Sequence, residues 1–176
     1  MFLHEQLRSL IITPALSKLQ LYSNDAEELL VFTCAAESDG GTYLKQIKGP
    51  ALGIYQMEPK TYNDIWQNYI RNRRDLTLLL THNFDVVRMP DENRMVYDLR
   101  FATAMARIHY CRVKEALPSA KDVEAIWNYY KTYYNTPSGK AMKSKAIKAY
   151  ETFIKKVSDS RAQVRVDQPH QDLVTP

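Results

Sequence analysis

Cysteine is scarce in this 176-residue sequence, which contains only Cys34 and Cys111. Both lie in strongly apolar stretches, so we expect two reduced, packed thiols and no disulfide framework. No pair of Cys or His clusters has the spacing of a zinc site. His109 and Cys111 are two residues apart, and on a helix such side chains point in different directions, so no metal site is expected there.

Long uninterrupted hydrophobic runs are also missing. The N-terminus, MFLHEQLRSLII, is broken by His4, Glu5 and Arg8. This stretch resembles neither a secretory signal peptide nor a transmembrane span, so we expect a protein made without an export signal and with no membrane span. The sequence has no Walker loop and no dinucleotide-binding glycine pattern, and we expect no cofactor.

Charge of one sign is in only small excess, because 24 Lys and Arg against 20 Asp and Glu give a net charge of +4. The basic residues are scattered, apart from short clusters at 71–74 and 140–156. A nucleic-acid module concentrates its excess on one face, so nucleic acid is disfavoured as a partner, and no helix-turn-helix pattern supports a DNA-binding regulator. A modest excess suits an anionic polymer such as a bacterial cell wall. The cluster at 140–156 is interpreted as the solvated face of a helix, with a binding role as the alternative.

Helical patterns fill most of the chain and predict a single all-α domain over residues 1–157. The expected helices begin at Thr13-Pro14, at a capping Asn24, at Pro59 with Thr61 as the cap, at Asp98, and at Ser119 with Asp122. The helix that begins at Pro59 is expected to run to residue 80. The helix that begins at Asp98 is expected to be the central core helix and to run to residue 117. A basic amphipathic helix is expected over 140–157. From 158 on, two prolines and the lack of a helical period predict an extended or disordered polar tail over 158–176.

Glycine is rare, and four of the five glycines fall at positions 40, 41, 49 and 53. They follow the run AEELLVFTCAAE, which is apolar almost all round and predicts a buried helix over 26–37. Glycine adopts backbone conformations that other residues avoid, so this concentration predicts a long irregular loop or a small hairpin after that helix.

Glu37 ends the apolar run and is the first candidate for chemistry. It shares a helix face with Leu30 and Cys34. Burial disfavours a charged carboxylate, and the negative end of the helix dipole disfavours it further, so both effects predict a raised pKa for Glu37. A carboxyl group with a raised pKa can act as a general acid. The alternative is a last-turn glutamate whose carboxylate reaches water past the end of the helix.

Two short motifs carry a family resemblance. The residues concerned are Ala36-Glu37-Ser38, the glycine-containing loop, the run ALGIYQM over 51–57, and then Pro59 and Thr61. They resemble the Glu-Ser and Gly-Leu-Met-Gln motifs of soluble lytic transglycosylases and goose-type lysozymes. The closest likeness is to small phage proteins with that domain. The resemblance covers residues 25–157 and implies a lysozyme-like helical fold. The second motif departs from the family pattern, since it reads Gly-Ile-Tyr-Gln.

The resemblance also implies roles for individual residues. Glu37 is similar to the catalytic acid and base of the family, and Tyr55 and Gln56 match cleft residues that contact the N-acetyl sugar. The neighbouring residues of the two motifs are assigned to substrate binding with them, namely Ser38, Gly53 and Met57.

A third family motif, Tyr-Asn followed by Ala-Gly, has its nearest match at Tyr134-Asn135, with Gly139 at an altered spacing. In the family the Tyr hydroxyl approaches the catalytic Glu, so Tyr134 and Asn135 are assigned to substrate binding. Four tyrosines, at 129, 130, 133 and 134, could line a saccharide groove. The alternative is that the pair at 130 and 134 belongs to the core and the other pair to the surface.

The implied reaction is cleavage of the β-1,4 bond between N-acetylmuramic acid and N-acetylglucosamine in peptidoglycan. A hydrolase with two carboxylates needs a second acidic group, whereas in a transglycosylase the 6-hydroxyl of the muramyl residue attacks its own anomeric carbon, and one Glu suffices. Asp39 and Glu58 are nearby carboxylates, but neither stands in a motif. We therefore expect a lytic transglycosylase, with hydrolysis left open.

The expected absence of an export signal favours delivery by a bacteriophage, either within the virion or from the host cytoplasm at lysis, to act on the cell wall in the periplasm. The polar tail at 158–176 is a candidate for contacts with other virion proteins. The alternative function is a structural virion or tail protein, in which a lysozyme-like scaffold has little or no catalysis.

Overall fold

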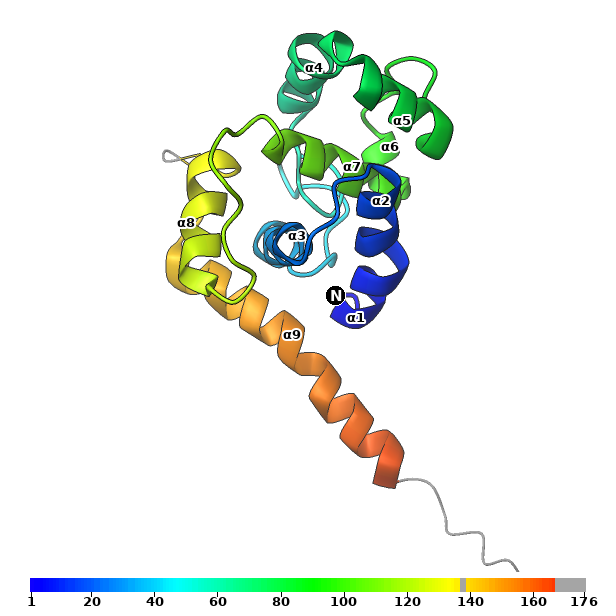
Figure 1. Ribbon diagram of the computed structural model, residues 1–176. Coiled ribbons are helices and arrows are strands. Elements are labelled where there is room, and N and C mark those ends of the chain that lie inside the picture. Colours follow the sequence, from blue (N-terminus) through cyan, green and yellow to red (C-terminus); the bar gives the residue numbers. More distant parts are fainter. Residues whose placement is uncertain (137–138, 167–176) are drawn as a thin grey trace, which may run out of the picture.

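The computed structural model describes residues 1–136 and 139–166, with side chains as far as residue 155, and it confirms the all-α prediction (Figure 1). In chain order its elements are α1 (His4–Gln6), the π-helix η1 (Leu7–Ile12), α2 (Thr13–Lys18), α3 (Asn24–Ser38), α4 (Pro59–Asn68), the 3₁₀ helix η2 (Ile70–Asn72), α5 (Arg74–Phe84), α6 (Arg94–Tyr97), α7 (Leu99–Tyr110), α8 (Val123–Tyr133) and α9 (Lys143–Val166). Within the described ranges no strand forms, and only isolated bridges pair Leu52 with Lys45 and with Met57. None of the helices described is long and apolar enough to cross a bilayer.

Helix α3 lies at the centre of the fold, with α7, α8, α9 and the N-terminal helices packed around it (Figure 1). The prediction of a buried helix that ends near Glu37 is confirmed. Its cap is Ser23 rather than the expected Asn24, because the Ser23 hydroxyl accepts a hydrogen bond from the Ala26 amide at 3.0 Å. The helix ends where Asp39 adopts a left-handed conformation, with φ of 52°. The centre of the fold therefore presents its last turn, with Glu37, to the following loop.

Helix α2 begins at Thr13 with Pro14 in its first turn, as predicted, but α1, η1 and α2 follow one another without a break, so it continues an earlier helical stretch. Pro14 has no amide hydrogen, and the wider π-helical turn that precedes it accommodates that missing donor. Thr13 does not cap a helix. Its hydroxyl donates to Glu27 Oε2 at 2.8 Å, and Arg8 pairs with Glu27 and Glu28, so these side chains attach the N-terminal stretch to α3.

The single helix expected over 61–80 is interrupted. Pro59 is the first residue of α4, the preceding residue Glu58 occupies the cap position, and Thr61 is not the cap. After Asn68 the chain passes through η2 and an extended Arg73, whose guanidinium lies 3.6 Å from the centre of the Tyr69 ring. The break redirects α5, so that its own apolar face is buried through Leu76, Leu80 and Phe84.

Helix α7 passes through the core and begins as predicted, because the Asp98 carboxylate accepts a hydrogen bond from the Phe101 amide at 2.9 Å. It ends at Tyr110 rather than at 117. The Cys111 carbonyl oxygen accepts the Tyr69 hydroxyl at 2.8 Å, a contact that replaces a helical hydrogen bond. Helix α8 is capped by Asp122 and not by Ser119. Both cysteines are free thiols.

Helix α9 starts at Lys143 rather than 140, and its first half packs against α3 through the buried Ala146, Tyr150 and Phe153. Its last turns extend away from the body of the protein (Figure 1). The prediction of an extended tail from 158 is wrong as far as Val166. The segment SDSRAQVRV contains neither glycine nor proline, so nothing in it stops the helix. Residues 167–176 of the expected tail lie outside the described residues.

Candidate active site

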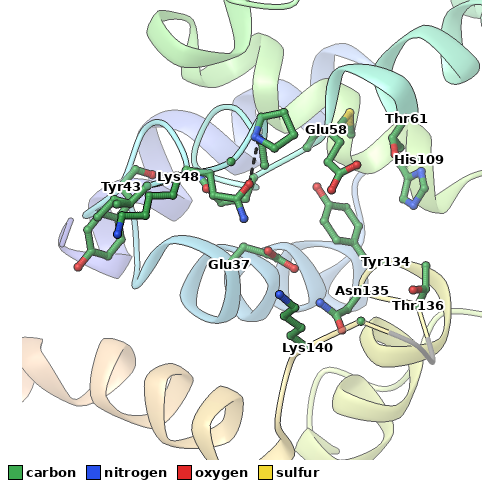
Figure 2. A pocket seen from close by; sticks show the side chains of 18 residues that line it. Glu37, Tyr43, Lys48, Glu58, Thr61, His109, Tyr134, Asn135, Thr136 and Lys140 are labelled. Atoms are coloured by element: carbon green, nitrogen blue, oxygen red, sulfur yellow. Dashed lines mark hydrogen bonds between the residues drawn. The ribbon is translucent and has the colours of Figure 1, made fainter.

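Glu37, in the last turn of α3, faces a cleft with a volume of about 770 Å³. Three parts of the chain supply most of its walls: the end of α3, the loop over 43–58, and residues 134–136 with 139–140 between α8 and α9 (Figure 2). The lining residues other than Glu37 are Tyr43, Gln46, Ile47, Lys48, Gly49, Pro50, Ala51, Gln56, Met57, Glu58, Thr61, His109, Tyr134, Asn135, Thr136, Gly139 and Lys140. The cleft is thus lined largely by polar side chains, with a carboxyl group between its two ends.

The environment of Glu37 raises the pKa of its carboxyl group, as its position at the end of a buried helix predicts. Burial is the largest cause, because it disfavours the charged form. Hydrogen bonds from Tyr130 and Asn135 act in the opposite direction, since they stabilise the carboxylate. The Tyr130 hydroxyl donates to Glu37 Oε1 at 2.7 Å. Glu37 is therefore a positioned acid that can lose its proton and still have hydrogen-bond donors for the charge.

Ser38 does not line the cleft and is fully buried. Its hydroxyl donates to the Ile54 carbonyl at 2.6 Å and accepts the Gly41 amide at 2.9 Å. This side chain connects the end of α3 to the loop that forms the opposite wall. Its assignment to substrate binding is corrected to a structural one, because it has no surface left for a ligand.

Gly53 is likewise structural and lies outside the cleft lining. Its φ is +72°, and a Cβ atom there would lie 2.4 Å from the Met95 carbonyl oxygen, so only glycine fits. The next wall residue, Gln56, does line the cleft. Its side-chain amide donates to the Gly53 carbonyl at 2.8 Å and to the Tyr43 carbonyl at 3.3 Å, which fixes the turn and leaves the side chain partly exposed.

Tyr55 points into the core and not into the cleft. Its hydroxyl forms a hydrogen bond of 3.1 Å with the Thr103 hydroxyl, and only 1% of the residue is exposed. The assignment of Tyr55 to substrate binding is therefore corrected to a place in the core. Met57 contributes to the cleft lining but is also largely buried, and its amide and carbonyl pair with those of Leu52. Of the residues assigned in this segment, Gln56 is the one with an accessible polar group.

The Tyr-Asn segment reaches the cleft, but with different partners from those expected. The Tyr134 hydroxyl donates to the Tyr55 carbonyl at 2.8 Å, so Tyr134 supports the opposite wall. The tyrosine that binds Glu37 is Tyr130, one helical turn earlier, and its ring stacks on that of Tyr134. Asn135 completes the site, because its side chain binds Glu37 while its Oδ1 accepts Lys131 Nζ at 2.8 Å. The sequence left Tyr130 open between a saccharide groove and the core; the residue is buried, and its bond to Glu37 was not predicted.

His109 is a cleft residue that the sequence did not indicate. Its Nε2 lies 3.0 Å from the Tyr133 carbonyl oxygen, which requires Nε2 to carry the proton. Burial lowers the pKa of His109 to about 4, so the ring is neutral at neutral pH. Its ring packs edge-on against Tyr134, with 5.0 Å between ring centres. His109 therefore positions Tyr134 as a neutral side chain.

The two carboxylates near Glu37 differ in position. Asp39 is an exposed residue beyond the end of α3 and does not line the cleft. Glu58 lines the cleft on the wall that faces Glu37, and although it occupies the cap position of α4, it makes no capping hydrogen bond (Figure 2). Among the residues described, no three His, Cys, Asp or Glu side chains group in a way that could bind a metal ion.

A comparison of this chain with family models, curated proteins and solved structures finds no match. The cleft itself presents one partly buried carboxyl group with a raised pKa and two hydrogen-bond donors for its ionised form. Such a group can give a proton to a bound molecule and take one back.

Proposed function

We propose that this protein is a peptidoglycan-cleaving glycosidase with a lysozyme-like fold, and specifically a lytic transglycosylase that acts on the β-1,4 bond between N-acetylmuramic acid and N-acetylglucosamine. The observation that carries the proposal is Glu37, a carboxyl group with a raised pKa that faces a long polar cleft and accepts a hydrogen bond from Tyr130. The Glu-Ser and Gly-Ile-Tyr-Gln motifs, which resemble those of soluble lytic transglycosylases, form two facing parts of this region.

In the proposed reaction Glu37 first gives its proton to the glycosidic oxygen as the bond from that oxygen to the muramyl anomeric carbon breaks. The 6-hydroxyl of the same muramyl residue then bonds to the anomeric carbon, and the Glu37 carboxylate takes the hydroxyl proton. The products are a 1,6-anhydromuramyl end and a free 4-hydroxyl on the departing sugar, and Glu37 regains its starting state. The raised pKa supports the first transfer, and the hydrogen bonds from Tyr130 and Asn135 support the transient carboxylate.

The rest of the cleft supports a saccharide ligand. Gln56, Thr61 and Asn135 offer amide and hydroxyl groups along its walls, and Tyr43 and Ile47 offer apolar surface for the face of a sugar ring. Ser38 and Gly53 support the site indirectly, because they fix the loop that carries one wall.

The experiment that tests this function is digestion of purified peptidoglycan by wild type and by Glu37→Gln, with mass spectrometry of the released sugars. We expect anhydromuramyl products from the wild type and none from the variant, with both proteins shown to be folded by circular dichroism. Reducing-end products would instead indicate a hydrolase, and Glu58→Gln would then test whether the facing carboxylate activates water. A folded wild type that releases nothing would contradict the proposal and favour a structural virion role for this scaffold.

A further inference from the structure

Two lysines of the cleft have side chains that the fold itself does not use. Lys48 comes from the loop over 43–58, and Lys140 comes from the segment that precedes α9. Both are exposed, and neither ammonium group has a hydrogen-bond or ion-pair partner among the described residues. By contrast, the nearby Lys131 donates to Asn135 and to the Gly139 carbonyl oxygen. The two cleft lysines thus have free charge to offer a ligand.

Lys48 also has a strained backbone. Its φ is +61°, in the left-handed region where a non-glycine residue costs about 1 kcal/mol. The loop around it is closed, because the Gln46 amide donates to the Ala51 carbonyl and the Gln46 side chain accepts the Ala51 amide. Glycine would adopt this conformation without strain. A lysine at this position therefore costs stability, and what it adds is an ammonium group on the wall of the cleft.

The charges along the cleft are unevenly distributed around Glu37. Lys140 lies beside Glu37 and Asn135, and Lys48 extends toward Tyr43 (Figure 2). Glu58 lies on the other side of Glu37, together with Thr61 and His109. When Glu37 carries its proton and His109 is neutral, Lys48 and Lys140 are the cationic groups of the lining and Glu58 is its remaining carboxylate. Such an arrangement distinguishes the two ends of a bound polymer.

We infer that Lys48 and Lys140 bind the carboxylates of the peptide stem that the muramyl sugar carries, so that the cleft selects stem-bearing glycan over stripped glycan. The inference rests on the proposed function, which requires the muramyl anomeric carbon to lie at Glu37. The stem is attached to that same sugar through its lactyl ether, so its free carboxylates lie near the acid. Ammonium groups pair with carboxylates through short, charge-assisted hydrogen bonds, and Glu58 repels the stem from the opposite end.

The test compares kcat/KM on soluble, uncrosslinked glycan strands that carry peptide stems with kcat/KM on the same strands after an amidase has removed the stems. We expect the wild type to prefer stem-bearing strands. The double variant Lys48→Met/Lys140→Met should lower this preference by about tenfold, which lies within the range for two exposed ion pairs. Lys48→Arg/Lys140→Arg should preserve it, and Lys121→Met, at an exposed lysine that does not line the cleft, is the matched control.

An equal preference in the wild type and in the double Met variant would overturn the inference, as would a wild type that cleaves both substrates equally well. If the wild type cleaves neither substrate, the proposed function fails, and cosedimentation with intact sacculi then decides this inference separately. Retention that the double Met variant loses, and that salt weakens, would support the lysine site without catalysis. Retention that is the same in both proteins would refute it.

Discussion

The Tyr130 hydroxyl donates a hydrogen bond of 2.7 Å to Glu37 Oε1, so a residue of α8 positions the carboxyl group at the end of α3. This bond favours the charged form of Glu37 and opposes the larger effect of burial on its pKa. The balance between these two effects sets the pH at which the acid loses its proton.

Removal of this hydroxyl should move the pH profile of the proposed cleavage reaction. Tyr130→Phe takes away a donor to the carboxylate, so the pKa of Glu37 rises further, and the alkaline limb of kcat/KM shifts to higher pH. The maximal kcat should fall, because the transient carboxylate loses a partner. Steady-state kinetics on peptidoglycan fragments over a range of pH provides the measurement. Tyr129→Phe is the control, since that hydroxyl bonds to the Glu115 carbonyl. Identical alkaline limbs in the two variants would contradict this role of Tyr130.

Glu37→Gln should stabilise the protein at neutral pH while it abolishes cleavage. The pKa of Glu37 is higher in the folded than in the unfolded protein, so wild-type stability falls as pH rises through the folded pKa. Glutamine keeps the hydrogen-bond acceptor for Tyr130 and never ionises. We expect the free energy of unfolding at pH 7 to increase by about 1 kcal/mol, and the gain to vanish near pH 4. Urea unfolding at both pH values measures this, and a gain that does not change with pH would argue against a buried, titrating Glu37.

His109 should make the fold sensitive to acid. Its folded pKa of about 4 lies below the ordinary value of 6.5, so wild-type stability is lost as pH falls between these values. The difference corresponds to about 3 kcal/mol at most. His109→Gln can retain a donor to the Tyr133 carbonyl without a titrating group, and thermal melts from pH 7 to pH 4 should show a shallower slope for this variant. His82→Gln, at an exposed helical position, is the control. Parallel slopes for wild type and His109→Gln would show that His109 titrates normally.

Gly53→Ala should destabilise the wall of the cleft. The backbone at Gly53 has a positive φ, and the new methyl group would meet a main-chain oxygen that cannot move aside. We expect a loss of about 3 kcal/mol in unfolding free energy. Gly49→Ala should cost less, because its φ is not in the left-handed region and the nearest atoms belong to the flexible Gln46 side chain. Chemical denaturation of both variants is decisive, and equal losses would remove the special role of Gly53.

The sequence predicted those parts of the fold that local rules govern. The apolar run before Glu37 identified the central helix, the Asp98 cap identified the start of α7, and the four clustered glycines identified the irregular wall. The position of Glu37 beside that wall was predicted as well. These features depend on periodicity, capping and backbone freedom, which a single sequence displays.

Features that depend on tertiary contacts were not predictable in this way. The helix beginning at His4 passes Pro14 through a π-helical turn, and α4 stops at Asn68 so that α5 can bury a second face. Tyr130, rather than Tyr134, reaches Glu37 because α8 lies against α3 with that side chain turned inward. No spacing rule within α8 distinguishes these two tyrosines.

The contribution of residues 134–136 and 139–140 to the cleft has a consequence for how its environment forms during translation. A nascent chain that has emerged only as far as α7 already contains Glu37 and the loop over 43–58, but none of the donors from α8 and the segment after it. Its carboxyl group then lacks the cover and the hydrogen-bond donors that these later residues supply. The environment that raises the pKa of Glu37 is therefore complete only when the final third of the chain has left the ribosome, and a prematurely terminated product contains this carboxyl group without those surroundings.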